Sequence, residues 1–381
     1  MVLIDQSAAL LVKGYAWLPD LRRRSGGTPV RTRVMGQPAV AVEGEEAARF
    51  FYASGHLERH TALPEPVTGT LFGKGAVQTL DGAVHRVRKA MFVSLLMGDG
   101  VTNLAEQTGA AFDRAAKTWQ GSTVTLFDET AKVIAGSVTR WAQIPVTDDE
   151  VPDLAADLVA MVDGFATGGP RHWRARRARG RRERWLAGQP LLTGRGLDPR
   201  VAAVEMLNII RPSTAVTWLV SFAAHALHRW PEHREPLAAG DDAFTAAFVH
   251  EVRRFDPFAP FLGGRAVRDL IFDGVEIPHG SLVLLDVYGQ NHDERLWPDP
   301  YAFRPERFID KQPGEFDLIP QGGGDPRTGH RCPGEQITVA LLGTLAQRLA
   351  RLDHRLPPQD LTIDLSRIPA RPRSGIRITV G

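Results

Sequence analysis

The sequence has little cysteine and no long apolar run free of charges. One cysteine among 381 residues, Cys332, excludes a disulfide within the chain. No stretch of about eighteen consecutive apolar residues occurs, so stable insertion into a membrane as a spanning helix is not expected. The N-terminal segment carries charges from Asp5 to Arg24 and lacks the apolar core and cleavage site of a secretory signal. A cytoplasmic location is therefore predicted.

The sequence also lacks a strong excess of charge of either sign. Its 46 lysines and arginines against 44 acidic residues give a formal charge of +2, which indicates neither nucleic acid nor an anionic membrane as a partner. Residues 171–184 are a local exception, because eight of them are arginine. The helical period of this run leaves a polar face, which favours a solvated helix beside a substrate entrance. No nucleic-acid partner is predicted.

Helical periodicity dominates the middle of the chain. With 43% hydrophobic residues the chain can bury a large core, and no segment looks like a flexible linker. Apolar residues recur at three- and four-residue intervals, which predicts helices over residues 101–119, 128–143, 149–165 and 171–186. Residues 1–381 are thus expected to form a single domain that is mainly α with small β-sheets.

A long central helix is predicted over residues 198–229. Asp198 is a suitable N-cap, and Pro199 is favoured at the first helical position. Pro212 removes a backbone donor and frees the carbonyl of Asn208, so a bend is expected there. Short strands are expected over residues 39–42, 271–277 and 282–287, and helices over residues 43–52 and 334–352.

Cys332 lies in a glycine-rich loop, residues 321–335, that leads directly into the last helix. The glycines allow a flat ligand to approach the backbone closely. Amide donors at the start of the helix would stabilise a thiolate, the form of cysteine that binds metals. His330 and Arg331 add positive charge beside it. A lone cysteine is more often a buried free thiol, so the loop alone leaves both interpretations open.

Three short motifs in the C-terminal third resolve this ambiguity. They are Glu251-x-x-Arg254, then Pro305-Glu-Arg307-Phe, then His330-x-Cys332-x-Gly. In this order and spacing the chain resembles the cytochrome P-450 superfamily. The resemblance implies that haem b lies between the long central helix and the helix after the cysteine loop, with Cys332 as the iron ligand. It also implies that Glu251, Arg254 and Arg307 form a buried structural network rather than catalytic groups.

The central helix departs from the common pattern of that superfamily. Most members carry an acid followed by a threonine, whereas residues 208–214 read Asn-Ile-Ile-Arg-Pro-Ser-Thr. Without a positioned proton donor, cleavage of dioxygen with electrons from a reductase should be poor. Arg211-Pro212, with residues 71–78, 81–89, 169–173 and 321–325, is similar to the bacterial fatty-acid peroxygenases. The resemblance implies a long-chain fatty acid as substrate, hydrogen peroxide as co-substrate and no reductase.

Arg211 and Pro212 are therefore candidate catalytic residues. A buried guanidinium is costly unless an anion meets it, and a carboxylate can accept two parallel hydrogen bonds from arginine. Such a pair would hold the α and β carbons of a fatty acid over the iron, and the carboxylate could relay the proton that cleaves peroxide. A simpler alternative is that Arg211 pairs with a helix neighbour or a carbonyl.

Further candidates follow from the same resemblance. Gln78 stands where histidine accompanies decarboxylation and glutamine accompanies hydroxylation, so it is a candidate catalytic and substrate-binding residue for hydroxylation at the α or β carbon. Decarboxylation to terminal alkenes, a reductase-dependent monooxygenase and a non-enzymatic haem-thiolate sensor or carrier remain the alternatives. The candidate cofactor-binding residues are His85, Arg88, Lys89 and His330. The candidate channel residues for an acyl chain are Phe72, Phe165, Phe258 and Phe261.

Overall fold

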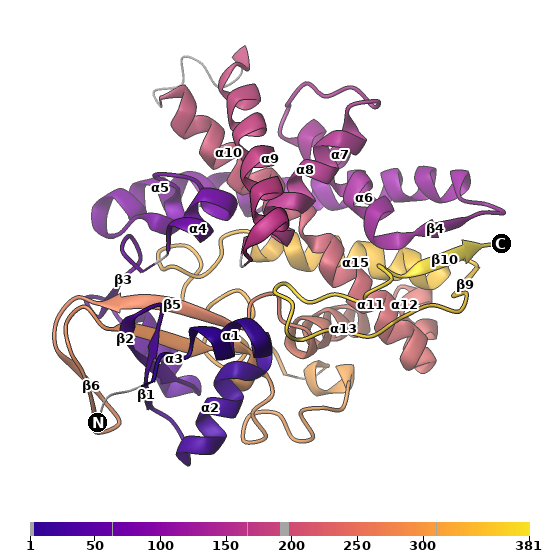
Figure 1. Cartoon of the computed structure of the whole chain (residues 1–381). Helices are drawn as coiled ribbons and strands as arrows, with labels where there is room; N and C mark the ends of the chain where they lie inside the picture. Colours follow the sequence, from indigo (N-terminus) through magenta and orange to yellow (C-terminus); the bar gives the residue numbers. More distant parts are fainter. Residues whose placement is uncertain (1–3, 63, 166, 191–197, 310) are drawn as a thin grey trace.

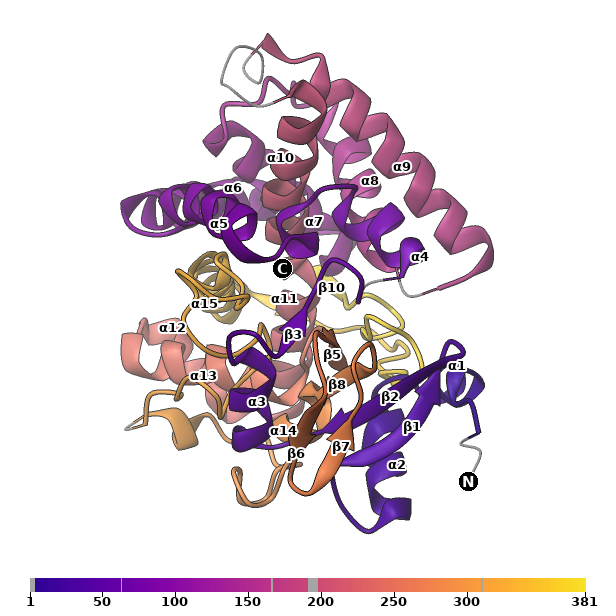
Figure 2. The ribbon, with the colours of Figure 1, turned by 90° about the vertical axis from the view of Figure 1, so that its left-hand side faces the viewer.

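The computed structural model describes residues 4–62, 64–165, 167–190, 198–309 and 311–381. Helices make up most of the molecule, and the strands form three small sheets (Figure 1). The long helices gather in one part of the molecule, and the largest sheet lies with α1, α2 and α3 in the other (Figures 1 and 2). The expected mainly helical fold with small sheets is confirmed.

The largest sheet joins distant parts of the chain. Its five strands run in the order β1-β2-β8-β5-β3. β2 pairs with β8 in parallel, with Val42 opposite Leu285, and the other pairings in this sheet are antiparallel. Its strands are β1 (Val30–Val34), β2 (Gln37–Val42), β3 (Leu57–Glu58), β5 (Phe261–Ala266) and β8 (Leu282–Asp286). N-terminal and C-terminal segments therefore share one sheet.

Two smaller sheets complete the β structure. One has the order β4-β10-β9 and the other is the pair β6-β7. Their bounds are β4 (Thr123–Thr125), β6 (Leu270–Phe272), β7 (Val275–Ile277), β9 (His354–Arg355) and β10 (Arg377–Val380). The single strand predicted over residues 271–277 was wrong. Asp273 and Gly274 adopt φ values of 47° and 71°, which turns this segment into a two-residue hairpin.

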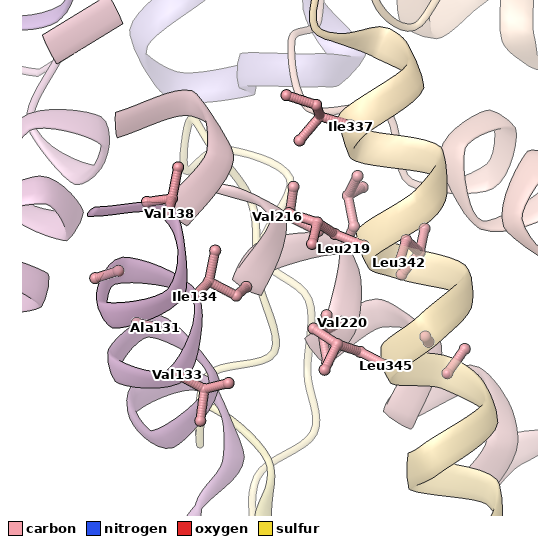
Figure 3. Close-up of a cluster of buried hydrophobic side chains, with 14 of the residues drawn as sticks. Ala131, Val133, Ile134, Val138, Val216, Leu219, Val220, Ile337, Leu342 and Leu345 are labelled. Atoms are coloured by element: carbon pink, nitrogen blue, oxygen red, sulfur yellow. The ribbon is translucent and has the colours of Figure 1, made fainter. Parts of the chain in front are cut away.

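The helices predicted from periodicity are present, with ends shifted by one or two residues. They are α6 (Asp99–Thr118), α7 (Leu126–Trp141), α8 (Val151–Asp163), α9 (Gly169–Ala187) and α15 (Glu335–Arg351). Figure 3 shows the centre of the core, where Val216, Leu219 and Val220 lie between Ile134 of α7 and Leu345 of α15. All five side chains are buried. This packing fixes the last helix, which follows the cysteine loop, against the middle of the molecule.

The central helix is split in two, α10 (Pro199–Thr214) and α11 (Val216–Arg229). Asp198 caps it as predicted, accepting hydrogen bonds from the N–H groups of Arg200 and Val201 at 2.9 and 3.3 Å. The break lies at Ala215 rather than at Pro212. The proline removes one donor, and the hydroxyls of the next two residues bond back to the carbonyls four residues before them, which weakens the following turn.

The remaining helices are shorter, apart from α5 and α13. They are α1 (Ser7–Lys13), α2 (Trp17–Ser25), α3 (Glu45–Tyr52), α4 (Glu65–Val67), α5 (Gly82–Leu96), α12 (Arg234–Ala239), α13 (Asp242–Phe255) and α14 (Val287–Asn291). α13 is capped by Asp241, which accepts from the N–H of Phe244 at 2.9 Å. Within the described ranges, no helix combines the length and the apolar character needed to cross a membrane.

Candidate active site around Cys332

The cysteine loop is held by its own backbone and passes close to Tyr52. The N–H of Cys332 donates to the carbonyl of Gln321 at 3.0 Å. Gly322 has a φ of 96°, and a Cβ atom there would approach the hydroxyl of Tyr52 to 2.5 Å. Glycine is required at this position for both reasons. The loop therefore reaches the start of α15 in a fixed path that presents Cys332.

The surroundings of Cys332 suit a metal-bound thiolate. The side chain is partly exposed, and burial raises the pKa of the thiol, whereas the N–H of Gly334 and the charge of Lys89 lower it. The predicted amide donor at the start of the helix is thus present. Among the described residues, no three His, Cys, Asp or Glu side chains gather to hold a metal ion. A metal here would depend on one protein ligand, as the iron of a haem does.

A buried cluster of basic side chains lies next to the cysteine loop. His85 and Lys89 of α5 are only 5% and 2% exposed. The ring of His85 stacks on His330 with centroids 4.0 Å apart, and Lys89 donates to the carbonyl of Arg331. Burial and neighbouring cations lower the pKa of His85 to about 4. Burial also lowers the pKa of Lys89 to about 8, opposed by the charges of Cys332 and Asp325. Three of the four predicted cofactor-binding residues therefore gather beside Cys332.

Arg59 joins this cluster, although the sequence gave no sign of it. It is buried, its guanidinium lies 4.2 Å from the centroid of the Phe51 ring, and in the described part of the chain Nη1 has no hydrogen-bond partner. Burial lowers the pKa of Arg59, and the charge of Asp81 opposes this. Asp81 accepts hydrogen bonds from the backbone N–H groups of Arg59 and His60. Arg59 is part of no motif, so only the tertiary structure reveals it.

The residues of this cluster fit the two carboxylates of a haem. Lys89 is paired with a neutral carbonyl, and Arg59 keeps an unsatisfied N–H, so both have donors to offer an anion. Arg88, which was also predicted to bind the cofactor, instead donates to Glu205 of α10 at 2.6 Å. The structure thus gives Arg88 a protein partner, and a contact between Arg88 and the cofactor stays a prediction.

Arg211 of α10 is a buried cation without a counter-ion. Its side chain is 3% exposed, and no described residue accepts a hydrogen bond from Nη1. The guanidinium lies 5.7 Å from the ring centroid of Phe72. Burial and the charge of Arg179 hold the pKa of Arg211 well below its ordinary value, opposed by Cys332 and Glu205. The alternative that Arg211 pairs with a neighbour or a carbonyl does not hold among these residues.

Pro212 differs from the residues around it. It is exposed, whereas Arg211 and Ser213 on either side are buried. Gln78 lies in a short turn, Val77–Thr79, and its Oε1 is buried without a partner in the described ranges. Arg211 and Gln78 thus each have a buried polar atom without a partner among the described residues, and Pro212 next to Arg211 is accessible.

Two residues that were not predicted fix the segment before Gln78. Arg179 of α9 donates to the carbonyls of Leu71 and Phe72 at 2.6 and 2.7 Å. Asn208 of α10 also donates to the carbonyl of Phe72, at 2.9 Å. These bonds hold the Phe72 segment against α10 and set the ring of Phe72 near Arg211. Neither residue belongs to a sequence pattern that signals such a contact.

Three of the four predicted channel residues lie together. Phe72, Phe165 and Phe258 pack in one apolar cluster, which also contains Leu71, Phe127, Val162 and Trp218. We call this the aromatic cluster. Phe261 lies outside this cluster, on β5, where its ring packs edge-on against Trp17 at 5.6 Å, and its place in the channel stays a prediction.

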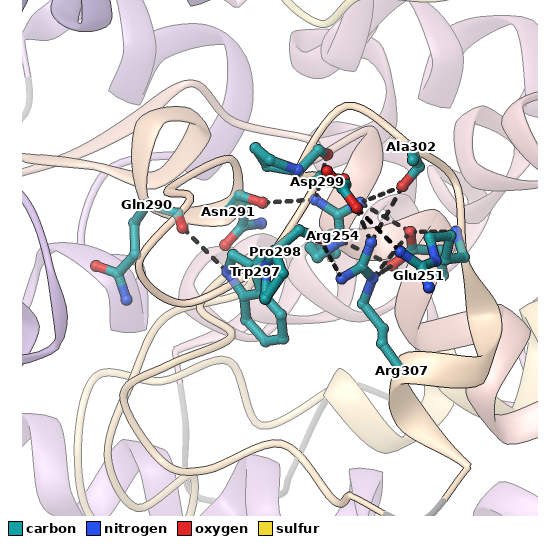
Figure 4. Close-up of polar contacts among 11 residues, drawn as sticks. Glu251, Arg254, Gln290, Asn291, Trp297, Pro298, Asp299, Ala302 and Arg307 are labelled. Carbon is teal, nitrogen blue, oxygen red and sulfur yellow. Dashed lines mark hydrogen bonds and ion pairs between the residues drawn. The ribbon is translucent and has the colours of Figure 1, made fainter.

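The predicted structural network is confirmed and is shown in Figure 4. Glu251 accepts two hydrogen bonds from Arg254, both at 2.7 Å, and pairs with Arg307 at 3.2 Å. Arg254 also donates to the carbonyls of Asn291 and Pro300. Glu251 and Arg254 are both 0% exposed. The network ties α13 to the segment that precedes the cysteine loop.

The arginine-rich run forms α9, and acidic residues meet much of its charge. Arg171 pairs with Asp163 at 3.0 Å, and Arg176 pairs with Glu65 at 2.8 Å. Asp157 accepts from both Arg181 and Arg182. These partners make α9 part of the helical framework and leave it a weak candidate for a nucleic-acid surface.

Sequence comparisons match the C-terminal third of the chain to a known family. Residues 243–369 match the family described as Cytochrome P450. Probable cytochrome P450 4e1 of Drosophila melanogaster is 29% identical over 161 residues, which is 37% of this chain and 30% of that protein. Cytochrome P450 71A8 of Mentha piperita is 34% identical over 132 residues, 33% of this chain and 26% of that protein. The aligned part thus spans less than a third of the length of these relatives.

Solved structures extend the likeness to the whole chain. Cytochrome P450EX alpha (CYP152N1) with myristic acid is 33% identical, with a TM-score of 0.93 over 100% of this chain and 97% of that one. Cytochrome P450SP alpha (CYP152B1) in complex with (R)-ibuprofen is 36% identical, with a TM-score of 0.94 over 99% and 98%. A variant of cytochrome P450 OleT in complex with arachidonic acid is 34% identical, with a TM-score of 0.94 over 100% and 98%. The structural relatives are CYP152 fatty-acid peroxygenases, and this chain belongs to the cytochrome P450 family.

Proposed function

We propose that this protein is a haem-thiolate peroxygenase that uses hydrogen peroxide to hydroxylate long-chain fatty acids at the α or β carbon. The observation that carries the proposal is Arg211, a buried guanidinium without a hydrogen-bond partner among the described residues, beside the aromatic cluster. A cation in an apolar site needs an anion, and a fatty acid joins a carboxylate to an apolar chain.

Haem b would be held from two sides. Cys332 would be the iron ligand, and Arg59, His85 and Lys89 would meet the carboxylates of the haem. When bound, the haem supplies an iron that activates hydrogen peroxide for oxygen transfer. Lys89 lies close enough to Cys332 for its charge to lower the pKa of the thiol, so this lysine favours the thiolate form that binds iron.

The substrate would take its orientation from Arg211 and the aromatic cluster. Arginine can donate two parallel hydrogen bonds to a carboxylate, which fixes the first carbons of the acid relative to α10. Phe72, Phe165 and Phe258 provide the apolar surface for the rest of the chain. Two of the structural relatives were solved with fatty acids, myristic and arachidonic acid, which supports this substrate class.

The substrate carboxylate would also move the proton. Thr214 is a poor candidate, because its hydroxyl already donates to the carbonyl of Ile210 at 2.9 Å and no acid precedes it in the sequence. A carboxylate held by Arg211 stands at the same part of α10 and can pass the peroxide proton from one oxygen to the other. The overall reaction converts a C–H bond and hydrogen peroxide into an alcohol and water, so no reductase would be needed.

Gln78 is the residue that we expect to influence which product forms. Its neutral amide neither gives nor takes a proton readily, whereas a histidine at this position could. Hydroxylation is therefore proposed over decarboxylation to terminal alkenes.

Variants of Arg211 test the proposal. Arg211→Ala should abolish peroxide-driven oxidation of myristic or palmitic acid while the haem stays bound, because the carboxylate loses its anchor. Arg211→Lys keeps the charge but not the paired donors, and should retain a small part of the activity. Arg24→Ala, an exposed arginine on α2, is the matched control and should leave turnover unchanged. Unchanged turnover in Arg211→Ala would overturn the assignment.

A further inference from the structure

A second arginine, Arg371, also stacks on a ring of the aromatic cluster, although it is only partly buried. Arg371 lies in the C-terminal segment between α15 and β10, drawn in yellow in Figure 2. Its guanidinium carbon lies 4.2 Å from the ring centroid of Phe127. Arg371 is partly exposed, and within the ranges that the structure describes no ion pair or hydrogen bond joins its guanidinium to another residue. Phe127 belongs to the aromatic cluster, as Phe72 does beside Arg211.

The acidic residues near Arg371 do not neutralise its surroundings. Asp163 already accepts from Arg171 at 3.0 Å and from Arg367. Asp128 is the other nearby carboxylate, and it is exposed. Three arginines thus face two carboxylates, which leaves one positive charge in excess. Burial also lowers the pKa of Arg371, so its charge is partly desolvated and would gain from an anion.

The surroundings of Arg371 are distinct from those of Arg211. The charged groups that act on Arg211 are Arg179, Cys332 and Glu205. Those that act on Arg371 are Arg171, Arg367, Asp128 and Asp163. The two sets share no member, yet both arginines pack on rings of the same aromatic cluster. Phe165, two residues after Asp163, belongs to this cluster and connects it with the charges around Arg371.

We infer that Arg371 binds a second carboxylate, which makes long-chain α,ω-dicarboxylic acids a substrate class of this protein. One carboxylate lies at Arg211, the methylene chain lies on the aromatic cluster, and the other carboxylate lies at Arg371. A guanidinium that stacks on an aromatic ring keeps its N–H edge free for two hydrogen bonds to a carboxylate. A site closed by apolar groups alone would reject such an acid, because its second charge would be buried without a partner. The inference rests on the proposed function, since it requires Arg211 as the first anchor.

Binding measured by calorimetry on the haem-loaded chain tests the inference without relying on turnover. The probes are palmitic acid and the series dodecanedioic, tetradecanedioic and hexadecanedioic acid. At least one dicarboxylic acid should bind as tightly as palmitic acid. Arg371→Ala should weaken that acid by about tenfold or more, the loss expected for a hydrogen-bonded charge, and change palmitic acid binding less than about twofold. The affinity of Arg371→Lys for the dicarboxylic acid should lie between that of the unaltered protein and that of Arg371→Ala.

A neighbouring arginine provides the matched control. Arg373 is exposed and faces Asp360 and Asp364 at 3.7 and 3.6 Å, so Arg373→Ala should change neither affinity. The inference is overturned if every dicarboxylic acid binds more weakly than palmitic acid, or if Arg371→Ala weakens both kinds of acid equally. Failure of palmitic acid itself to bind, or binding that Arg211→Ala leaves intact, would instead contradict the proposed function.

Discussion

Removing the carboxylate of Glu251 should destabilise the fold severely. Glu251→Ala leaves Arg254, which is 0% exposed, as a buried cation without its partner, and it weakens the hold on Arg307. It also removes the acceptor for the N–H of Arg304, bonded at 2.7 Å. Breaking a buried ion pair from one side costs about 3–5 kcal/mol. Domains typically unfold with about 5–15 kcal/mol, so the variant would lose a large part of its stability.

Unfolding of the haem-loaded protein in urea, followed by circular dichroism and by haem absorbance, measures this loss. Glu45→Ala is the control, because Glu45 forms an exposed pair with Arg49 at 2.7 Å and such pairs contribute about 0–1 kcal/mol. The double variant Glu251→Leu with Arg254→Met should recover part of the loss, since it removes both charges. Recovery stays incomplete, because the carbonyls of Asn291 and Pro300 lose their donor. A loss in Glu251→Ala no larger than in the control would refute the reasoning.

Three further changes probe the cofactor, the product and the pH dependence. Arg59→Ala should weaken haem retention by about tenfold, because a buried donor to a haem carboxylate is lost. Transfer of haem to an acceptor protein measures this, and retention equal to that of the unaltered protein would remove Arg59 from the site. Gln78→His should raise the share of terminal alkenes among the products in gas chromatography, and an unchanged product ratio would remove Gln78 from product control. Burial raises the pKa of Asp286 to about 7. Between about pH 4 and pH 7 the folded protein therefore keeps a proton on Asp286 that the unfolded chain releases. The free energy of unfolding should fall as pH rises through this range. Asp286→Asn should flatten this slope and gain at most about 4 kcal/mol over the unaltered protein above about pH 7, measured by urea unfolding; parallel pH profiles would contradict it.

The parts of the fold that depend on neighbours in sequence could be predicted. Helical periodicity located α6 to α9, and Asp198 with Pro199 marked the start of α10. Glu251 and Arg254 are three residues apart on one helix, so a local motif was enough to indicate their pairing. The position of the helix break was wrong by three residues, because it depends on the added effect of two hydroxyls after Pro212.

Contacts between distant segments could not be predicted. Arg59 reaches the basic cluster only because β3 pairs with β5, about two hundred residues later in the chain, and no pattern around Arg59 signals this. Phe261 could not be told apart from Phe258 by composition, yet the pleat of β5 sends it to Trp17. Arg88 lies one residue from Lys89 and therefore on another side of α5, where Glu205 meets it.

Product analysis by mass spectrometry shows directly whether this protein oxidises fatty acids with hydrogen peroxide. The haem-loaded protein is mixed with myristic or palmitic acid and hydrogen peroxide, and no reductase is added. We expect hydroxy acids with the new oxygen on the α or β carbon. Absence of product with the haem intact, together with oxidation of the same acid when a reductase system replaces peroxide, would contradict this expectation.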